Sequence, residues 1–155
     1  MIKKIILGTD HAGFELKEEI KKFLVKQGYK VEDKGAYSYN PDDDYPEFIL
    51  AAAQEVAKDE NFRGIILGGS GQGEAIVANK VKGIRAAIYY GSNIEIIKKS
   101  RTHNNANILS LGARSLPKDE ALKAVKLWLD TDFENNERHA RRIKQIKDME
   151  KNLLK

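Results

Sequence analysis

The sequence predicts an α/β fold: a single Rossmann-like three-layer domain around a five-stranded parallel sheet. Short β-branched or apolar runs alternate with segments of helical periodicity along most of the chain. This alternation is typical of a parallel sheet with helices on both faces. At 155 residues, the chain also has the length of one ordinary domain with its own core. We therefore expect residues 1–155 to form a single domain.

The expected strands are short apolar or β-branched runs at residues 2–7, 29–31, 64–67, 85–89 and 107–111. The first expected helix has apolar residues at Leu16, Ile20, Phe23 and Leu24, and Gly28 ends it. Further helices are expected at residues 46–58, through residues 76 and 77, at 93–101 and at 117–129. Ligands of such sheets bind beyond the carboxyl ends of the strands, so the segments directly after the strands carry the candidate site.

The chain changes character after residue 130, where a polar, strand-free segment leads to a final expected helix at about 138–153. Its apolar residues recur at spacings of three and four, at Ile143, Ile146, Met149 and Leu153. The pattern equally supports two interpretations. The helix packs against a second subunit, or it folds back on its own domain.

The composition indicates a soluble, globular protein, because 41% of the residues are hydrophobic and 32% are charged. No apolar run approaches the roughly 18 residues that span a membrane, and Asp10 and His11 interrupt the start before an export signal could form. The absence of cysteine excludes disulfides, thiolate metal sites and cysteine nucleophiles. It also fits the reducing cytoplasm, where we expect the protein to lie.

The segment LGGSGQGEAIVANK, residues 67–80, begins like a phosphate-binding glycine loop. Its glycines allow backbone amides to converge on one oxyanion at the start of the next helix. However, Glu74 and Ala75 stand where a nucleotide-binding loop carries Lys and Ser or Thr, and Ile76 breaks the dinucleotide fingerprint. The loop therefore argues against both ATP and NAD.

Glu74 supports two interpretations. It is either a first-turn acid favoured by the helix dipole, or a carboxylate base beside the amides of the glycine loop. Oxyanion-stabilising amides next to a base form the combination that removes a proton alpha to a carbonyl group.

The candidate residues outside the glycine loop also have two interpretations each. Asp10 and His11 follow the first strand, where Asp10 could simply cap a helix. His103 and Asn104 end a helix, where a histidine often satisfies the helix dipole. The histidines at 11, 103 and 139 lack the local spacing of a metal site, so no metal is expected.

The basic residues predict an anion site only weakly. Arg138 and Arg142 lie one helical turn apart, a spacing suited to gripping a phosphate, but a solvated basic face has the same pattern. The net charge of +4 comes largely from scattered lysines. The basic tail is short and has no interleaved aromatic residues, so no nucleic-acid partner is expected.

Taken in order, the segments GTDHAGFELK, DDDYP, GIILGGSGQGEAIVANKVKGIRAA, HNNANILSLGAR and ERHARRI cover nearly the whole chain. In this order they resemble the B-type ribose-5-phosphate isomerases, a family that includes galactose-6-phosphate and allose-6-phosphate isomerases. The resemblance implies an aldose-ketose isomerase that interconverts ribose 5-phosphate and ribulose 5-phosphate without a cofactor. It also implies a homodimer, or a pair of dimers forming a tetramer, with active sites built across the subunit interface.

The resemblance also implies roles for individual residues. Asp10 would handle the sugar hydroxyls, with Tyr45 close by, and His103 would open the sugar ring from the neighbouring subunit, assisted by Asn104. The amides around a cis-enediolate would be those of Gly69, Ser70, Gly71, Gln72 and Gly73. The phosphate would be held by Arg114, Arg138 and Arg142, with His11 nearby.

One departure from the family bears on the base. Many relatives carry a catalytic cysteine at the position of Gly68, whereas a second branch uses a glutamate after the glycine loop, and this chain resembles that branch. Glu74 is therefore the expected base on both arguments, and burial would raise its pKa. Two alternatives stay open: an isomerase of a six-carbon sugar phosphate, and a non-catalytic sugar-phosphate sensor.

Overall fold

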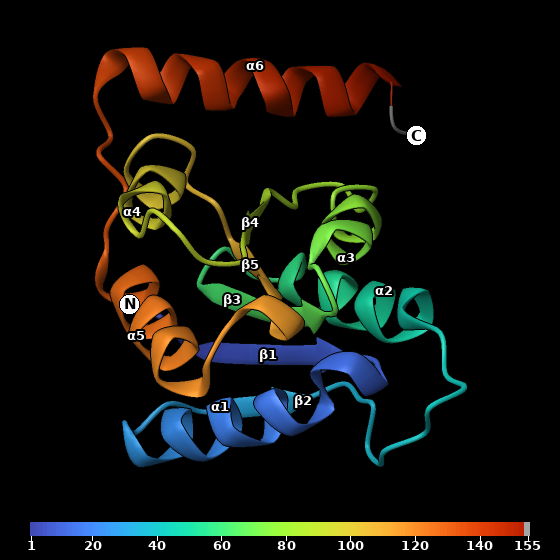
Figure 1. Cartoon of the computed structure of the whole chain (residues 1–155). Helices are drawn as coiled ribbons and strands as arrows, with labels where there is room; N and C mark the ends of the chain where they lie inside the picture. Colours follow the sequence, from blue (N-terminus) through green and yellow to red (C-terminus); the bar gives the residue numbers. More distant parts are fainter. Residues whose placement is uncertain (154–155) are drawn as a thin grey trace.

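The computed structural model describes residues 1–153 and contains one parallel sheet with the strand order β2-β1-β3-β5-β4 (Figure 1). The strands are β1 (Lys4–Thr9), β2 (Val31–Asp33), β3 (Phe62–Gly68), β4 (Ala86–Tyr89) and β5 (Ile108–Gly112). The helices are α1 (Phe14–Lys26), α2 (Tyr45–Val56), α3 (Gln72–Ala78), α4 (Glu95–Thr102), α5 (Lys118–Asp130) and α6 (Glu137–Leu153). Short 3₁₀ turns follow two strands, η1 (His11–Gly13) and η2 (Ala113–Ser115). The predicted five-stranded α/β fold is confirmed.

Helices cover both faces of the sheet because successive side chains of a strand point to opposite sides. Ile5 and Leu7 of β1 pack in one cluster with α1, α4 and α5, whose largest buried side chain is Trp128. Ile6, between them in the sequence, packs in a second cluster with α2 and α3. Continuous apolar strands such as β1 and β3 are what a sheet buried on both faces requires.

Two strands begin two residues later than the sequence predicted: β1 at Lys4 instead of residue 2, and β2 at Val31 instead of residue 29. Gly28, with φ of +89°, ends α1, and the amide of Tyr29 donates to the carbonyl oxygen of Leu24 at 3.1 Å. Tyr29 therefore belongs to the helix cap, and pairing with β1 begins at Val31, opposite Ile5. The polar sequence Val-Glu-Asp of β2 carries little strand signal.

Helix α6 lies along the outside of the molecule, beyond α4 and α3 (Figure 1). Only Ile143 of this helix is buried, whereas Ile146, Met149 and Leu153 are exposed. A hollow of about 540 Å³ lies between these apolar residues and the β4 side of the sheet. Helix α6 therefore touches its own domain but leaves much of its apolar stripe uncovered.

Within residues 1–153, no helix combines the length and the apolar character that crossing a bilayer requires.

Candidate active site

The candidate site lies where the strand order reverses. From β1 the chain continues to β2 on one side, while β3 pairs with β1 on the other side. The carboxyl ends of β1 and β3 therefore form the switch point at which open α/β sheets bind ligands. The turn η1 follows β1 there, and the glycine loop follows β3.

The glycine loop is fixed in place by contacts with β5. Gly71 has φ of +78°, and a Cβ on it would lie 3.0 Å from the carbonyl carbon of Leu111. The carbonyl oxygen of Gly71 accepts hydrogen bonds from Ser110 Oγ at 2.6 Å and from the amide of Ala75 at 3.1 Å. The amide of Gln72 donates to Ser70 Oγ at 3.3 Å. The predicted strand-to-helix loop is therefore a rigid turn that leads into α3.

Glu74 lies in the first turn of α3 and is only 4% exposed. A Cβ on Gly68 would lie 1.8 Å from Glu74 Oε1, so the carboxylate occupies the space that any side chain at position 68 would need. Burial raises the pKa of Glu74, and the negative charge of Asp10 adds to this rise. The carboxylate is thus seated against the end of β3, in an environment that makes it a stronger base.

Tyr45 and Arg114 flank the glycine loop. A Cβ on Gly73 would lie 2.4 Å from the Tyr45 hydroxyl, and one on Gly69 would lie 3.0 Å from an Arg114 guanidinium nitrogen. The backbone amide of Arg114 also donates to the carbonyl oxygen of Gly69 at 3.1 Å. The missing side chains at the two glycines therefore let a phenol and a guanidinium lie directly against the loop.

The segment after β1 adds an acid and a histidine, and the segment before α2 adds a second acid. Asp10 Oδ1 accepts from the amide of Ala12 at 2.9 Å, so Asp10 does cap η1, while its other oxygen lies 4.0 Å from His11 Nδ1. Asp43, from the segment before α2, accepts two hydrogen bonds from His11, from Nδ1 at 2.8 Å and from the amide at 2.9 Å. The sequence analysis missed Asp43. Its only signal was the acidic run before Tyr45.

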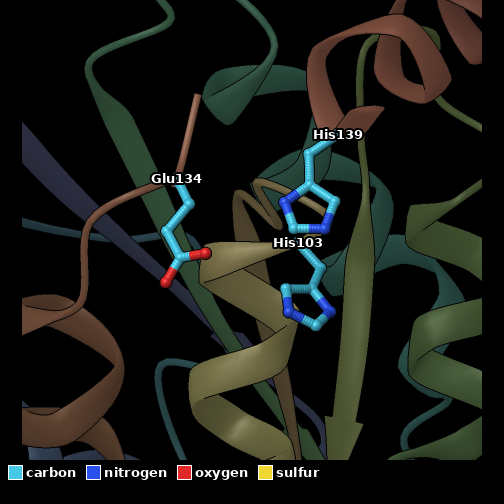
Figure 2. Close-up of side chains that lie close together, drawn as sticks. All are labelled: His103, Glu134 and His139. Carbon is cyan, nitrogen blue, oxygen red and sulfur yellow. The ribbon is translucent and has the colours of Figure 1, made fainter. Parts of the chain in front are cut away.

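The remaining predicted residues, His103, Asn104, Arg138 and Arg142, lie elsewhere in the chain. Because β4 and β5 are parallel, α4 must return the chain to the amino edge of the sheet, opposite the glycine loop. His103 follows α4 and stacks on His139, with ring centroids 4.3 Å apart (Figure 2). Arg138 and Arg142 are exposed at the start of α6. Within residues 1–153, no hydrogen bond or ion pair joins this group to the glycine loop.

Two sets of side chains bring potential metal ligands within 4.8 Å of one another. One is His103, Glu134 and His139, drawn in Figure 2. The other is Asp10, His11 and Asp43, where the Asp43 oxygen already accepts the Nδ1 hydrogen of His11. In this second set, His11 and Asp43 already form a hydrogen-bonded pair, with Asp10 beside them. The expectation that the protein uses no metal or other cofactor stays a prediction.

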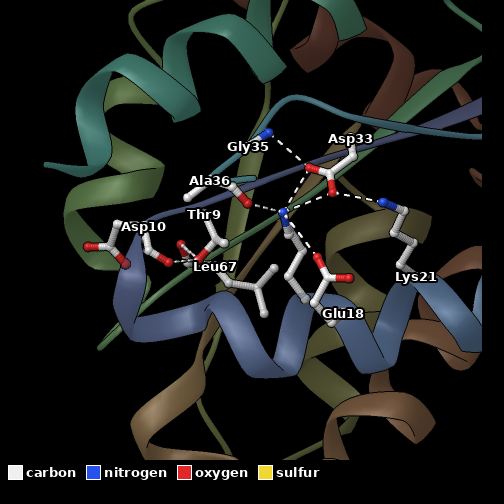
Figure 3. A network of polar contacts seen from close by, with 9 residues as sticks. Thr9, Asp10, Glu18, Lys21, Asp33, Gly35, Ala36 and Leu67 are labelled. Carbon is white, nitrogen blue, oxygen red and sulfur yellow. Dashed lines mark hydrogen bonds and ion pairs between the residues drawn. The ribbon is translucent and has the colours of Figure 1, made fainter. Parts of the chain in front are cut away.

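A buried polar network lies behind the site (Figure 3). The fully buried ammonium group of Lys17 donates to both oxygens of Asp33, at 2.8 and 2.9 Å, and to the carbonyl oxygen of Ala36 at 2.5 Å. The amide of Ala36 in turn donates to the carbonyl oxygen of Thr9 at 2.7 Å. Lys17 thereby ties the segment after β2 to the end of β1, which carries Asp10.

Comparison with known proteins identifies the family. The model of the ribose/galactose isomerase family matches residues 5–146. The chain belongs to this family. It is 43% identical over 148 residues to ribose-5-phosphate isomerase B of Mycolicibacterium paratuberculosis, covering 96% of this chain and 92% of that protein. It is 40% identical to the Escherichia coli ribose-5-phosphate isomerase B, covering 94% and 95%.

Solved structures of the ribose/galactose isomerase family share the fold. The crystal structure of ribose-5-phosphate isomerase B from Mycoplasma genitalium, which contains bound ribulose-5-phosphate, matches with a TM-score of 0.91 at 36% identity and covers 96% of each chain. The Clostridium thermocellum enzyme matches with a TM-score of 0.88 at 45% identity and covers 96% of this chain and 98% of its own. The expected family is therefore confirmed.

Proposed function

We propose that this protein interconverts ribose 5-phosphate and ribulose 5-phosphate, with Glu74 as the base. Membership of the ribose/galactose isomerase family and the ribulose-5-phosphate complex of the Mycoplasma genitalium relative support the reaction. The observation that carries the choice of base is the buried Glu74 carboxylate, seated against Gly68 at the start of the glycine loop.

The proposed reaction moves one proton from C2 to C1 and a second proton from the C2 hydroxyl to O1. His103 helps to open the furanose ring, and Glu74 then removes the proton from C2 of the aldose. The amides of residues 69–73 stabilise the negative charge of the cis-enediolate, while Asp10 contacts the sugar hydroxyls. Glu74 then returns its proton to C1, while the proton of the C2 hydroxyl passes to O1, which gives the ketose and leaves Glu74 as a carboxylate again. Arg114, with Arg138 and Arg142, holds the phosphate.

We further propose that the working enzyme is a homodimer in which each site combines two chains. The carboxyl edge of one sheet would supply Glu74 and the glycine loop, and the partner would supply His103, Asn104, Arg138 and Arg142. Two features support this arrangement: α4 ends at the opposite edge of the sheet from the loop, and α6 leaves apolar residues uncovered. Pairing of dimers into a tetramer and a cytoplasmic location stay predictions.

Mixing two inactive variants tests the shared site. Glu74→Gln and His103→Asn subunits should each be nearly inactive, because each lacks one group of every site. After subunit exchange by refolding the mixture, half of the dimers are hybrids, and each hybrid has one intact site. We therefore expect about a quarter of wild-type activity to return. If mixing restores nothing although the hybrids form, both groups must come from one chain.

Proton NMR of ribose 5-phosphate in deuterated water tests the reaction itself. Ribulose 5-phosphate should appear, with deuterium entering the carbon that receives the proton. Parallel runs with allose 6-phosphate and galactose 6-phosphate test the alternative of a six-carbon sugar-phosphate isomerase. That alternative predicts that one of these two sugars is turned over faster than ribose 5-phosphate. Binding of ribose 5-phosphate with no ketose from any substrate would contradict the proposal and favour the sensor.

A further inference from the structure

We propose that Asp43 is a positioning residue that holds His11 as an imidazolium facing the substrate phosphate. This inference rests on the proposed function for the identity of the anion. The pairing of Asp43 with His11 stands on the geometry alone.

Asp43 fixes both the backbone and the ring of His11. One carboxylate oxygen, Oδ1, accepts from His11 Nδ1 at 2.8 Å and from the His11 amide at 2.9 Å. A carboxylate only accepts, so Nδ1 must carry a hydrogen, and the orientation of the ring is set. Within residues 1–153 the ring hydrogen-bonds only through Nδ1, so Nε2 is available to a ligand.

The surroundings of this pair favour the charged form of His11. The side chain of Asp43 is 6% exposed, and its second oxygen, Oδ2, is buried and has no hydrogen-bond partner among the described residues. A buried carboxylate of this kind needs a nearby positive charge. The groups that face the imidazole are Asp10 from its own segment, Asp43, Arg114 from η2 and the ring of Tyr39 at 6.4 Å. The hydrogen bond to Asp43 and the two nearby acids raise the pKa of His11, against the opposing effects of burial and Arg114.

The turn η1, which carries His11, packs against the turn η2, which carries Arg114. Arg114 lies against Gly69 at the glycine loop, and it is close enough to His11 to act on its charge. Two cations beside a row of glycine amides suit a doubly charged phosphate. Without Asp43, His11 would lose its proton near neutral pH, and a neutral imidazole attracts a phosphate less strongly. Asp43 therefore acts on the substrate only through His11.

Asp43→Asn tests this role because it removes the charge but keeps the shape. Near pH 7, just above the ordinary histidine pKa, the variant should show a KM for ribose 5-phosphate up to about tenfold above wild type, with kcat nearly unchanged, because one charge-assisted hydrogen bond to the phosphate is weakened. As the pH falls below the ordinary histidine pKa, the two KM values should approach each other, since protonation then charges His11 in the variant as well. The substrate phosphate also titrates in this pH range, but it does so equally in both assays. The ratio of the two KM values is therefore independent of it. Asp42→Asn, a neighbouring exposed acid, serves as the matched control and should behave like wild type.

Histidine NMR gives a second readout that needs no activity. The His11 ring signal, assigned by its loss in His11→Asn, should titrate at a lower pH in Asp43→Asn than in wild type. His11→Asn, with Asp43 intact, should reproduce the raised KM near pH 7, and its KM should not approach the wild-type value at lower pH. The proposal is overturned if the His11 titration does not move in Asp43→Asn, or if His11→Asn keeps the wild-type KM. If the His11 titration shifts but the protein has no isomerase activity, the proposed reaction is refuted, while the pairing of Asp43 with His11 is still supported.

Discussion

Glu74→Gln should lower the turnover of ribose 5-phosphate about a thousandfold and change its KM by about twofold or less, because a positioned general base contributes about a hundred- to ten-thousandfold. Glutamine has the shape of glutamate and fits the same space against Gly68, so the loop and the binding groups should keep their positions. The measurement is the rate of ketose formation, together with exchange of the C2 proton in deuterated water. A variant with full activity would place the base elsewhere.

Two further variants separate catalysis from a helix-dipole role of Glu74. Glu47 is an exposed first-turn acid of α2, so Glu47→Gln makes the same chemical change in a similar helix position. It should leave turnover unchanged. Gly68→Ala keeps Glu74 but places a methyl group where its carboxylate lies. If catalysis requires the Glu74 carboxylate in this position, this variant should also lose most of its turnover.

The fold prediction that the structure confirms rests on residues that lie close together in the sequence. The role of Glu74 as the base stays a prediction. Glu74 follows the glycine loop directly, and β1 and β3 are continuous apolar runs, so the chain order already contains the arrangement. The β2 boundary was missed because Glu32 and Asp33 are polar, and their place in the sheet depends on lysines from other elements, such as Lys4 and Lys17.

Contacts between distant residues could not be predicted. Asp43 pairs with His11, which lies 32 positions away, and nothing local to Asp43 distinguishes it from the acids beside it. The steric exclusion between Gly68 and the Glu74 carboxylate also requires coordinates. The separation of His103 from the glycine loop, in contrast, follows from strand order, because a helix between parallel strands returns the chain to the opposite edge.

Lys17→Met should lower the free energy of unfolding by about 3–5 kcal/mol, the typical cost of removing one partner of a buried ion pair. Lys17 is fully buried. Its loss would leave the 10% exposed carboxylate of Asp33 with only Lys21 and the Gly35 amide as donors among residues 1–153. The segment through Ala36 would also lose its tie to Lys17, so activity should fall along with stability. Urea denaturation at neutral pH measures the change in free energy.

Lys21→Met is the matched control, because this lysine donates to the same carboxylate at 3.0 Å but is 40% exposed. An exposed pair contributes about 0–1 kcal/mol, so the control should unfold almost like wild type.

The pH dependence of the unfolding free energy gives a second check. Burial alone would raise the pKa of Asp33, but the hydrogen bonds from Lys17, Gly35 and Lys21 outweigh it and hold the pKa below 3.8. A depressed carboxylate pKa stabilises the fold above the unfolded value and loses that effect as the pH falls through the folded value. The difference in free energy of unfolding between wild type and Lys17→Met should therefore become smaller in acid. If this difference is the same at every pH, Lys17 stabilises the fold by packing and not by its charge.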